Sequence, residues 1–183
     1  MPTITTNGIR QNYELTGSGQ TTMVWIHGIG SSLEYWNNDL EQFKNLQHLS
    51  YDVRGMGNSE GTPDAVSLEI WAQDLSMLLE SLDIEKAIIA GSSMGGAIAQ
   101  RFAIDFPEKT QALLLLSTSS RVGEAATAHW MEQANETESS GKIFLAQAQR
   151  AVASYNMDEE LKSISVPTLI IVCLLYTSDA ADE

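Results

Sequence analysis

The fold of this chain is decided by the stretch Ala87-Ile-Ile-Ala-Gly-Ser-Ser-Met-Gly-Gly96. Its first four residues are apolar and predict a short buried strand, while the small-residue run Met94–Phe106 predicts a helix that ends before a proline. Between them, Gly91, Ser93 and Gly95 fit the pattern G-x-S-x-G. A serine pattern of this kind carries chemistry when it joins a strand to a helix, and both flanking elements are predicted here.

Ser93 is therefore the candidate nucleophile of the chain. Glycine is needed at Gly91 and Gly95 because a Cβ atom there would collide with the neighbouring strand and helix. The Ser93 hydroxyl would lie near a helix N-terminus, where the dipole and free N–H groups favour developing negative charge. An ordinary glycine turn between a strand and a helix is the structural alternative, and the flanking elements favour the catalytic interpretation.

A second glycine-rich loop, His27-Gly-Ile-Gly30, follows the apolar strand predicted over Thr22–His27. Gly28 would let this loop direct the backbone N–H of Ile29 into the space above the sheet. Together with the N–H of Met94 it would form a two-donor oxyanion hole. Alone the loop is weak support, because tight turns after strands commonly contain glycine. We expect His27 to brace this loop by hydrogen bonding and not to act as a base.

The third glycine turn is Asp52-Val-Arg-Gly-Met-Gly57, and we interpret its Asp and Arg as a structural brace. The remaining predicted elements alternate along the chain. They are a hairpin around Asn7-Gly8, strands over Leu46–Asp52, Gln111–Leu116 and Thr168–Val172, and helices over Trp36–Lys44 and from Ser67 to Leu82. This order implies a mostly parallel sheet with helices on both faces.

Residues 120–163 are polar, with weak helical periodicity, and are predicted to form helices inserted between two core strands. We refer to them as the lid segment. The predicted division is a core over residues 1–119, the lid segment, and a further core strand within residues 164–172.

The three glycine turns, in this order, resemble the α/β-hydrolase superfamily from the hairpin to Val172. Gly91–Gly96, Leu116-Ser-Thr-Ser-Ser-Arg-Val-Gly123 and the short lid segment look most like 3-oxoadipate enol-lactonase and its esterase relatives. The resemblance implies a mostly parallel sheet with a helical lid after the sixth strand. It also implies hydrolysis of a small carboxylic ester or lactone through an acyl-enzyme on Ser93, without a cofactor or metal.

The resemblance fails at the rest of the catalytic triad. In this superfamily the acid and then the histidine follow the serine along the chain. The acid loop typically reads Gly-x-x-Asp after the strand that is here Thr168–Val172, but Cys173 and Tyr176 occupy those positions. Asp179 has the wrong spacing. We therefore predict no triad acid in this chain.

No triad histidine is predicted either. His129 is the one histidine after Ser93 and belongs to the lid segment, where a histidine is more often exposed or at the cavity entrance than acting as a base. His48 lies in a predicted strand upstream, with no motif around it.

The residues after Val172 give a reason for both absences. Read back into codons, Cys173–Glu183 resembles a translated sequencing-library adapter. We therefore expect residues 173–183 to be a non-native tail and the fold to be incomplete at its C-terminus, lacking strand–helix units of about 30 residues each. A genuine acidic C-terminal segment is the alternative. We expect such a chain to be poorly soluble and to have little esterase activity, because an unpaired strand and apolar faces would be uncovered.

Composition excludes several classes of partner. A net charge of −14 argues against nucleic acid and anionic membranes, which both favour Lys and Arg. Cys173 is the sole cysteine, so residues 1–172 have no thiol for a disulfide or metal site. The start of the chain lacks the pattern of a signal peptide, and no apolar run reaches membrane-spanning length. We expect a cytoplasmic protein with a small-molecule substrate, and its oligomeric state stays open.

Other functions remain possible. A non-catalytic hydrolase-like binding protein could lack a triad, and a cofactor-free peroxidase or a C–C bond hydrolase could use the same serine turn. Dehalogenases and epoxide hydrolases are disfavoured because their nucleophile is an aspartate. Nucleotide binding is disfavoured because Gly91–Gly96 lacks the Lys-Ser/Thr ending of a phosphate-binding loop.

Overall fold

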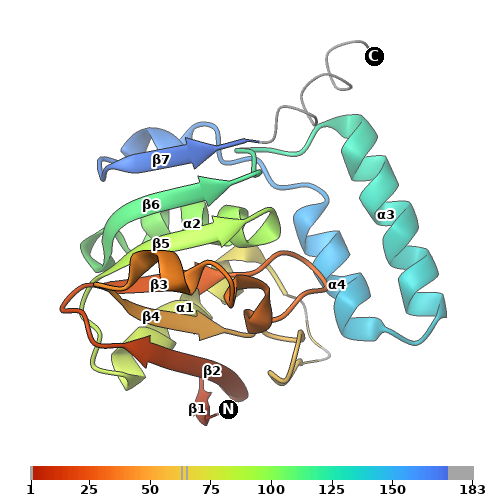
Figure 1. Cartoon of the computed structure of the whole chain (residues 1–183). Helices are drawn as coiled ribbons and strands as arrows, with labels where there is room; N and C mark the ends of the chain where they lie inside the picture. Colours follow the sequence, from red (N-terminus) through yellow and green to blue (C-terminus); the bar gives the residue numbers. More distant parts are fainter. Residues whose placement is uncertain (1, 63, 65, 173–183) are drawn as a thin grey trace.

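The structure is a computed structural model that describes residues 2–62, 64 and 66–172. The predicted non-native tail, residues 173–183, lies outside the described residues. The described strands are β1 Thr3–Thr6, β2 Ile9–Gly17, β3 Thr22–Ile26, β4 Gln47–Tyr51, β5 Ala87–Ser92, β6 Thr110–Leu116 and β7 Thr168–Ile171. The α-helices are α1 Leu68–Ser81, α2 Met94–Asp105, α3 Glu124–Ser139 and α4 Ile143–Val152, and the short 3₁₀ helices are η1 Leu33–Trp36, η2 Leu40–Phe43, η3 Pro107–Lys109 and η4 Glu160–Ser163 (Figure 1).

The described strands form one sheet in the order β1-β2-β4-β3-β5-β6-β7. β1 pairs with β2 and β2 with β4 in antiparallel fashion, and the pairs from β4 through β7 are all parallel. The hairpin turn has positive φ at Asn7 (46°) and Gly8 (75°), the conformation that two-residue hairpin turns require. The predicted mostly parallel sheet with an N-terminal hairpin is confirmed.

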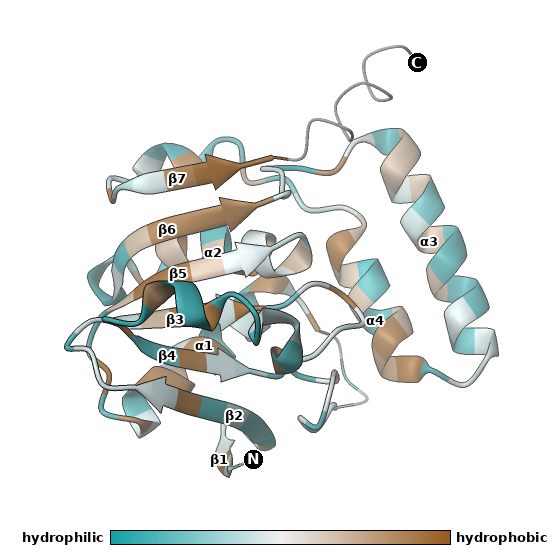
Figure 2. Ribbon diagram, viewed as in Figure 1, coloured by the Kyte–Doolittle hydropathy of each residue, from teal (hydrophilic) through white to brown (hydrophobic). Residues whose placement is uncertain are grey.

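Both faces of the sheet are covered, because the side chains of its central strand alternate between two apolar clusters. Val24 and Ile26 of β3 pack in a large cluster with residues of α1 and α2. Met23 and Trp25 face the other way, into a smaller cluster with Trp36 of η1. Figure 2 shows apolar residues along β5 and β6 and also along β7, at the edge of the sheet. Helices were predicted on both faces: α1 and α2 cover one face, and among the described residues the 3₁₀ helix η1 packs on the other.

Helix α1 begins where its sequence indicates. The hydroxyl of Ser67 accepts a hydrogen bond from the backbone N–H of Ile70 at 3.3 Å, as an N-cap does. The helical spacing of the apolar residues buries Trp71, Leu75 and Leu78 against the sheet.

The helix predicted over Trp36–Lys44 is wrong. This region forms two four-residue 3₁₀ helices, η1 and η2, separated by Asn37, Asn38 and Asp39. Asn and Asp disfavour a helix interior because their side chains compete for backbone hydrogen bonds. Residues 37–39, between Trp36 of η1 and Leu40 of η2, therefore remain a turn.

The lid segment contributes the pair α3 and α4, joined through Gly141 at a φ of 83°. Figure 1 places both helices beyond the carboxyl ends of β5, β6 and β7. α3 has a single buried side chain, Ala134, whereas α4 buries Ala148 and Val152 in the large apolar cluster. The weak periodicity of the sequence thus reflects a mostly exposed helix that packs along α4.

The prediction of a buried strand over Thr168–Val172 is half correct. β7 is parallel to β6, as expected, but Leu169 and Ile170 are 59% and 62% exposed. Buried parallel strands are covered on both faces, and within the described part of the chain nothing pairs with the outer side of β7. An apolar strand therefore lies at the edge of the sheet.

Candidate active site

The turn between β5 and α2 holds Ser93 in an unusual backbone conformation, with φ 54° and ψ −119°. Its neighbours Ser92 and Met94 are buried, whereas Ser93 is exposed. The Ser93 N–H donates to the carbonyl of Leu116 at 2.9 Å, and the Ser93 carbonyl accepts from the N–H of Gly96 at 2.9 Å. Strain of this kind persists only where surrounding contacts impose it, and it concentrates at functional sites.

Glycine at Gly91 and Gly95 permits the tight packing of this turn. A Cβ atom at Gly91 would lie 2.7 Å from the backbone nitrogen of Gly96, and one at Gly95 would lie 2.7 Å from the carbonyl oxygen of His27. Both are backbone atoms, which cannot yield as a flexible side chain can. The steric requirement expected at these two positions is present.

The loop after β3 lies directly beside this turn. A Cβ atom at Gly28 would lie 3.6 Å from the Cβ of Ser93. Among the described residues, no acceptor takes a hydrogen bond from the backbone N–H of Ile29 or from that of Met94. Two unpaired backbone donors therefore accompany Ser93.

His27 is fully buried and uses both ring nitrogens in the loop structure. The N–H of Val53 donates to Nε2 at 3.0 Å, so Nδ1 is assigned the proton and donates to the carbonyl of Gly28 at 2.7 Å. Burial lowers the pKa of His27, which keeps the ring neutral. These contacts join the loop after β3 to the loop after β4.

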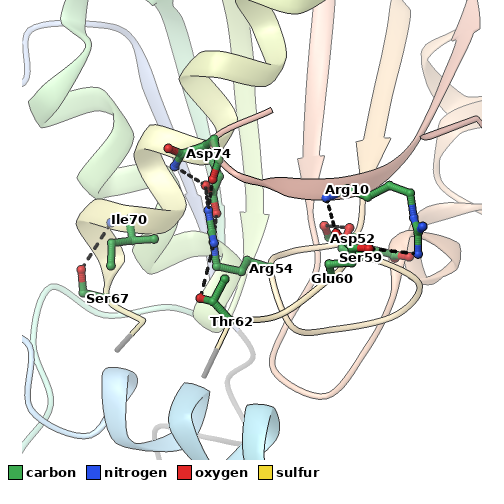
Figure 3. Close-up of polar contacts among 10 residues, drawn as sticks. Arg10, Asp52, Arg54, Ser59, Glu60, Thr62, Ser67, Ile70 and Asp74 are labelled. Atoms are coloured by element: carbon green, nitrogen blue, oxygen red, sulfur yellow. Dashed lines mark hydrogen bonds and ion pairs between the residues drawn. The ribbon is translucent and has the colours of Figure 1, made fainter. Parts of the chain in front are cut away.

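Asp52 and Arg54 both brace this region, through different partners. Asp52 is buried and accepts hydrogen bonds from the N–H of Leu33 and the N–H of Asn58, each at 2.7 Å. Arg54 instead reaches α1 and forms a two-point contact with Asp74, at 2.7 and 2.6 Å (Figure 3). Asp52 thereby fixes the turns around the site, and Arg54 fixes them to the helix layer.

A cavity of about 660 Å³ lies above the turn. Ser93, Ile29 and Met94 line it from the core, and Trp130 and Val152 line it from the lid helices. The other lining residues are Ser117, Thr118, Ser119, Arg121, Val122, Gly123, Ala126, Tyr155 and Val172. Its size lies within the range of small-molecule sites, and the predicted nucleophile and both predicted donors share it.

The lining residues of Ser117–Gly123 and Tyr155 were not identified as site residues from the sequence. A signal for the first group existed, since these residues follow β6 directly and carboxyl ends of parallel strands gather ligands. Tyr155 had no such signal, because it reaches the cavity through the return of the chain after α4.

In the described part of the chain, no imidazole or carboxylate is hydrogen-bonded to Ser93. His129 is exposed on α3, near the ring of Trp130, and does not line the cavity. His48 is buried in β4, where its ring accepts from Trp25 Nε1 at 3.1 Å and contacts the carbonyl of Phe43. The described residues also contain no cluster of three potential metal ligands, and none of their helices is long and apolar enough to span a membrane.

Comparison with known sequences gives the family. A family model for the alpha/beta hydrolase fold matches residues 21–156. The chain is 28% identical over 147 residues to 3-oxoadipate enol-lactonase 2 of Acinetobacter baylyi, covering 79% of this chain and 54% of that protein. It is 34% identical over 117 residues to a 2-hydroxymuconate semialdehyde hydrolase of a Pseudomonas species, covering 61% of this chain and 41% of that protein. The chain thus spans about half the length of these relatives or less.

Solved structures show the same fold. An enol-lactonase from Burkholderia xenovorans superposes with a TM-score of 0.84 at 22% identity, over 93% of this chain and 80% of that one. A thermophilic esterase from Thermogutta terrifontis superposes with a TM-score of 0.83 at 23% identity, over 93% of this chain and 79% of that one. On the match over residues 21–156, supported by this shared architecture, the chain belongs to the alpha/beta hydrolase fold family.

Proposed function

We propose that this chain carries the nucleophile and the oxyanion hole of a serine hydrolase that acts on a small carboxylic ester or lactone. The observation that carries the proposal is the strained backbone of Ser93, which exposes this side chain in a cavity between buried neighbours. Ser93 would attack the carbonyl carbon to form an acyl-enzyme. The lactonase name of the Acinetobacter relative supports the substrate class.

The unpaired N–H groups of Ile29 and Met94 would stabilise the oxyanion. Backbone donors that are fixed before the reaction bind negative charge as it develops, and one such donor is worth about 3 kcal/mol in the transition state. Gly28 supports this role because it allows the loop to approach Ser93 closely. His27 would hold the loop, since both of its ring nitrogens are already engaged.

Lid helices α3 and α4 would close the cavity over the substrate. Trp130 and Val152 provide apolar surface from this side. We propose a small-molecule substrate and no nucleic-acid partner, because a net charge of −14 repels phosphate.

The chain as it stands would be a poor catalyst. Ser93 needs a general base, and the described residues place none beside it. An oxyanion hole and substrate binding without a working triad still accelerate such reactions by about 10³-fold over water. Only this residual activity is expected from residues 1–183.

A hydrolase of carbon–carbon bonds is the second candidate. The Pseudomonas relative, a 2-hydroxymuconate semialdehyde hydrolase, is the more similar by identity over the aligned part. Such an enzyme would use the same serine turn and oxyanion donors. A binding protein without catalysis is the outcome if Ser93 proves unreactive.

The test supplies the missing base from solution. The purified chain is incubated with p-nitrophenyl acetate, with and without imidazole, and the acetylated species is followed by intact mass and peptide mapping. We expect imidazole to accelerate acetylation of Ser93. Ser93→Ala should lose this adduct, while Ser92→Ala, which removes the adjacent hydroxyl, should retain it. Equal modification of the Ser93→Ala chain would refute the proposed nucleophile.

A further inference from the structure

Three consecutive hydroxyl-bearing residues follow β6 and line the cavity above Ser93: Ser117, Thr118 and Ser119. The Thr118 Oγ1 atom is buried and cannot reach a ligand. Ser119 Oγ already donates to the carbonyl of Arg121 at 2.7 Å. Ser117 is exposed, and its hydroxyl has no hydrogen-bond partner within the described part of the chain. Of the three hydroxyls, that of Ser117 is therefore the one that is both accessible and unpaired.

The backbone holds Ser117 in a conformation that serine rarely adopts. Its φ is 45°, in the left-handed region, where a Cβ atom is disfavoured. The N–H of Ser117 donates to the carbonyl of Ile171 at 2.8 Å, and the carbonyl of Leu116 accepts from the N–H of Ser93 at 2.9 Å. One peptide group thus joins Ser117 to β7 and to the serine turn. Because glycine would adopt this φ without strain, the strain draws attention to the hydroxyl itself.

Ser117 and Ile29 lie on opposite sides of Ser93. The strands β3, β5 and β6 are parallel neighbours in that order, and the three residues follow their carboxyl ends (Figure 1). The carbonyl oxygen of Leu116 is 2.9 Å from the Ser93 nitrogen, and standard backbone dimensions place it about 2.8 Å from the Ser117 Cα. The Ser117 Cα is therefore within about 6 Å of the Ser93 nitrogen.

An ester bound at Ser93 has three groups to place around its carbonyl carbon. Under the proposed function, the carbonyl oxygen points to the N–H groups of Ile29 and Met94. Apolar surface for a hydrocarbon chain lies on the lid side, at Trp130 and Val152. The remaining group begins with the ester oxygen, which is unfavourable against an apolar surface and fits beside a free hydroxyl. Ser117 supplies that hydroxyl on the side away from Ile29.

We propose that the Ser117 hydroxyl donates a hydrogen bond to the ester oxygen that leaves when Ser93 is acylated. This inference rests on the proposed function and narrows its substrate class to oxygen esters and lactones, because the sulfur of a thioester is a weak acceptor. The bond from Ser93 Oγ to the acyl carbon forms as the bond from that carbon to the ester oxygen breaks. The base that takes the proton of Ser93 delivers it to the leaving oxygen, and Ser117 keeps its own proton.

The contact favours the transition state over the bound substrate. In an ester, the bridging oxygen shares its lone pair with the carbonyl and is a poor acceptor. As the carbon becomes tetrahedral this conjugation is lost, and negative charge then develops on the oxygen as it leaves. A hydrogen bond that strengthens in this way accelerates the reaction and does not merely tighten binding.

The test compares two acyl donors that differ in one atom. Phenyl acetate and S-phenyl thioacetate transfer the same acetyl group to Ser93, with imidazole as the base, and intact mass gives both rates. Ser117→Ala should slow acetylation by the ester about tenfold and acetylation by the thioester less than about twofold. Ser120→Ala is the matched control, because Ser120 belongs to the same segment but does not line this cavity. It should leave both rates unchanged.

A stability measurement separates this contact from a structural role. Ser117→Gly also lacks the hydroxyl, but glycine adopts a φ of 45° without strain. It should unfold at a higher urea concentration than Ser117→Ala and show the same loss of rate with phenyl acetate. If the rate of Ser117→Gly instead returns to that of the parent chain, the loss in Ser117→Ala comes from the fold and the contact is overturned.

The contact can fail while the proposed function stands. If Ser117→Ala slows the ester and the thioester equally, or slows neither, while Ser93 is still acetylated, the contact is wrong and the nucleophile is retained. If neither donor acetylates Ser93 in the parent chain, the proposed function is wrong and the contact falls with it.

Discussion

Replacement of Asp74 by alanine should destabilise this chain far more than removal of any exposed ion pair. Asp74 lies on α1 and accepts three hydrogen bonds. Two come from Arg54 Nε and Nη2, at 2.7 and 2.6 Å (Figure 3), and one comes from Asn7 Nδ2 at 2.5 Å. The carboxylate thereby joins the hairpin turn, the loop after β4 and the helix layer.

The magnitude follows from burial. The side chains of Arg54 and Asp74 are 6% and 1% exposed. Removing one partner leaves a buried charge without compensation, which costs about 3–5 kcal/mol. Glu159 and Lys162 have the same separation of 2.6 Å but are 84% and 70% exposed, and such a pair contributes less than about 1 kcal/mol. Since a domain has a total stability of about 5–15 kcal/mol, Asp74→Ala removes a large part of it.

The assay is urea unfolding followed by tryptophan fluorescence, with Glu159→Ala as the control. A third variant, Arg54→Met with Asp74→Leu, removes both charges and should recover much of the loss, because apolar side chains of similar volume fit a buried site without desolvating a charge. If Asp74→Ala unfolds at the same urea concentration as Glu159→Ala, or if the double variant is no more stable than the single one, the reasoning from burial is refuted.

Three further predictions use other parts of the molecule. A Cβ at Gly61 would lie 2.7 Å from the Phe144 ring, whose residue is 42% exposed and can yield in part. Gly61→Ala should therefore displace Phe144 at the start of α4, cost about 1 kcal/mol, the low end for overpacking, and increase hydrogen exchange there. Gly123→Ala, with open space around it, should not, and equal exchange in both variants would exclude this packing effect. Burial lowers the pKa values of His27 and His48, so the unfolded chain takes up protons first as the pH falls below about 6.5. The free energy of unfolding should therefore decrease below that pH and gain nothing from these groups above it. Urea midpoints measured across this range give the slope of stability against pH. His48→Gln should reduce this slope, and the exposed His129→Gln should not. The exposed apolar residues of β7 should cause association, measured by light scattering, and Ile170→Lys should suppress it; a monodisperse monomer before the change would contradict this prediction.

The parts of the site that were predictable are local in the sequence. The turn at Ser93 needs a strand, two glycines and a helix within one short stretch, and all of them follow from residue type and period. The loop at Gly28 and Ile29 is recognisable for the same reason. These features combine local backbone requirements with local hydrophobic patterns, so tertiary packing does not have to be known in advance.

The parts that were missed depend on contacts between distant segments. Arg54 was interpreted as part of a structural brace, but the sequence did not identify its partner, Asp74, which lies on α1. The helical spacing contained a usable signal, because Asp74 lies one turn from Trp71 and Leu78, on the side of α1 that is buried and mainly apolar. A carboxylate at a buried helical position requires a partner cation. Arg54, in the loop that follows β4, was a candidate for that cation.

The exposure of β7 and the lining of the cavity show a second limit of local reasoning. An apolar run such as Thr168–Val172 predicts a strand but not whether another element covers it, since burial belongs to the assembled sheet. Likewise, Arg121 lines the same cavity as Ser93 because residues 120–122 pair with residues 155–157, which follow both lid helices in the sequence. The chemistry that we propose would therefore be encoded in short stretches, whereas the choice of substrate would depend on how the lid segment returns to the core. Exchange of the lid segment between relatives should accordingly change ligand preference while leaving the geometry at Ser93 intact.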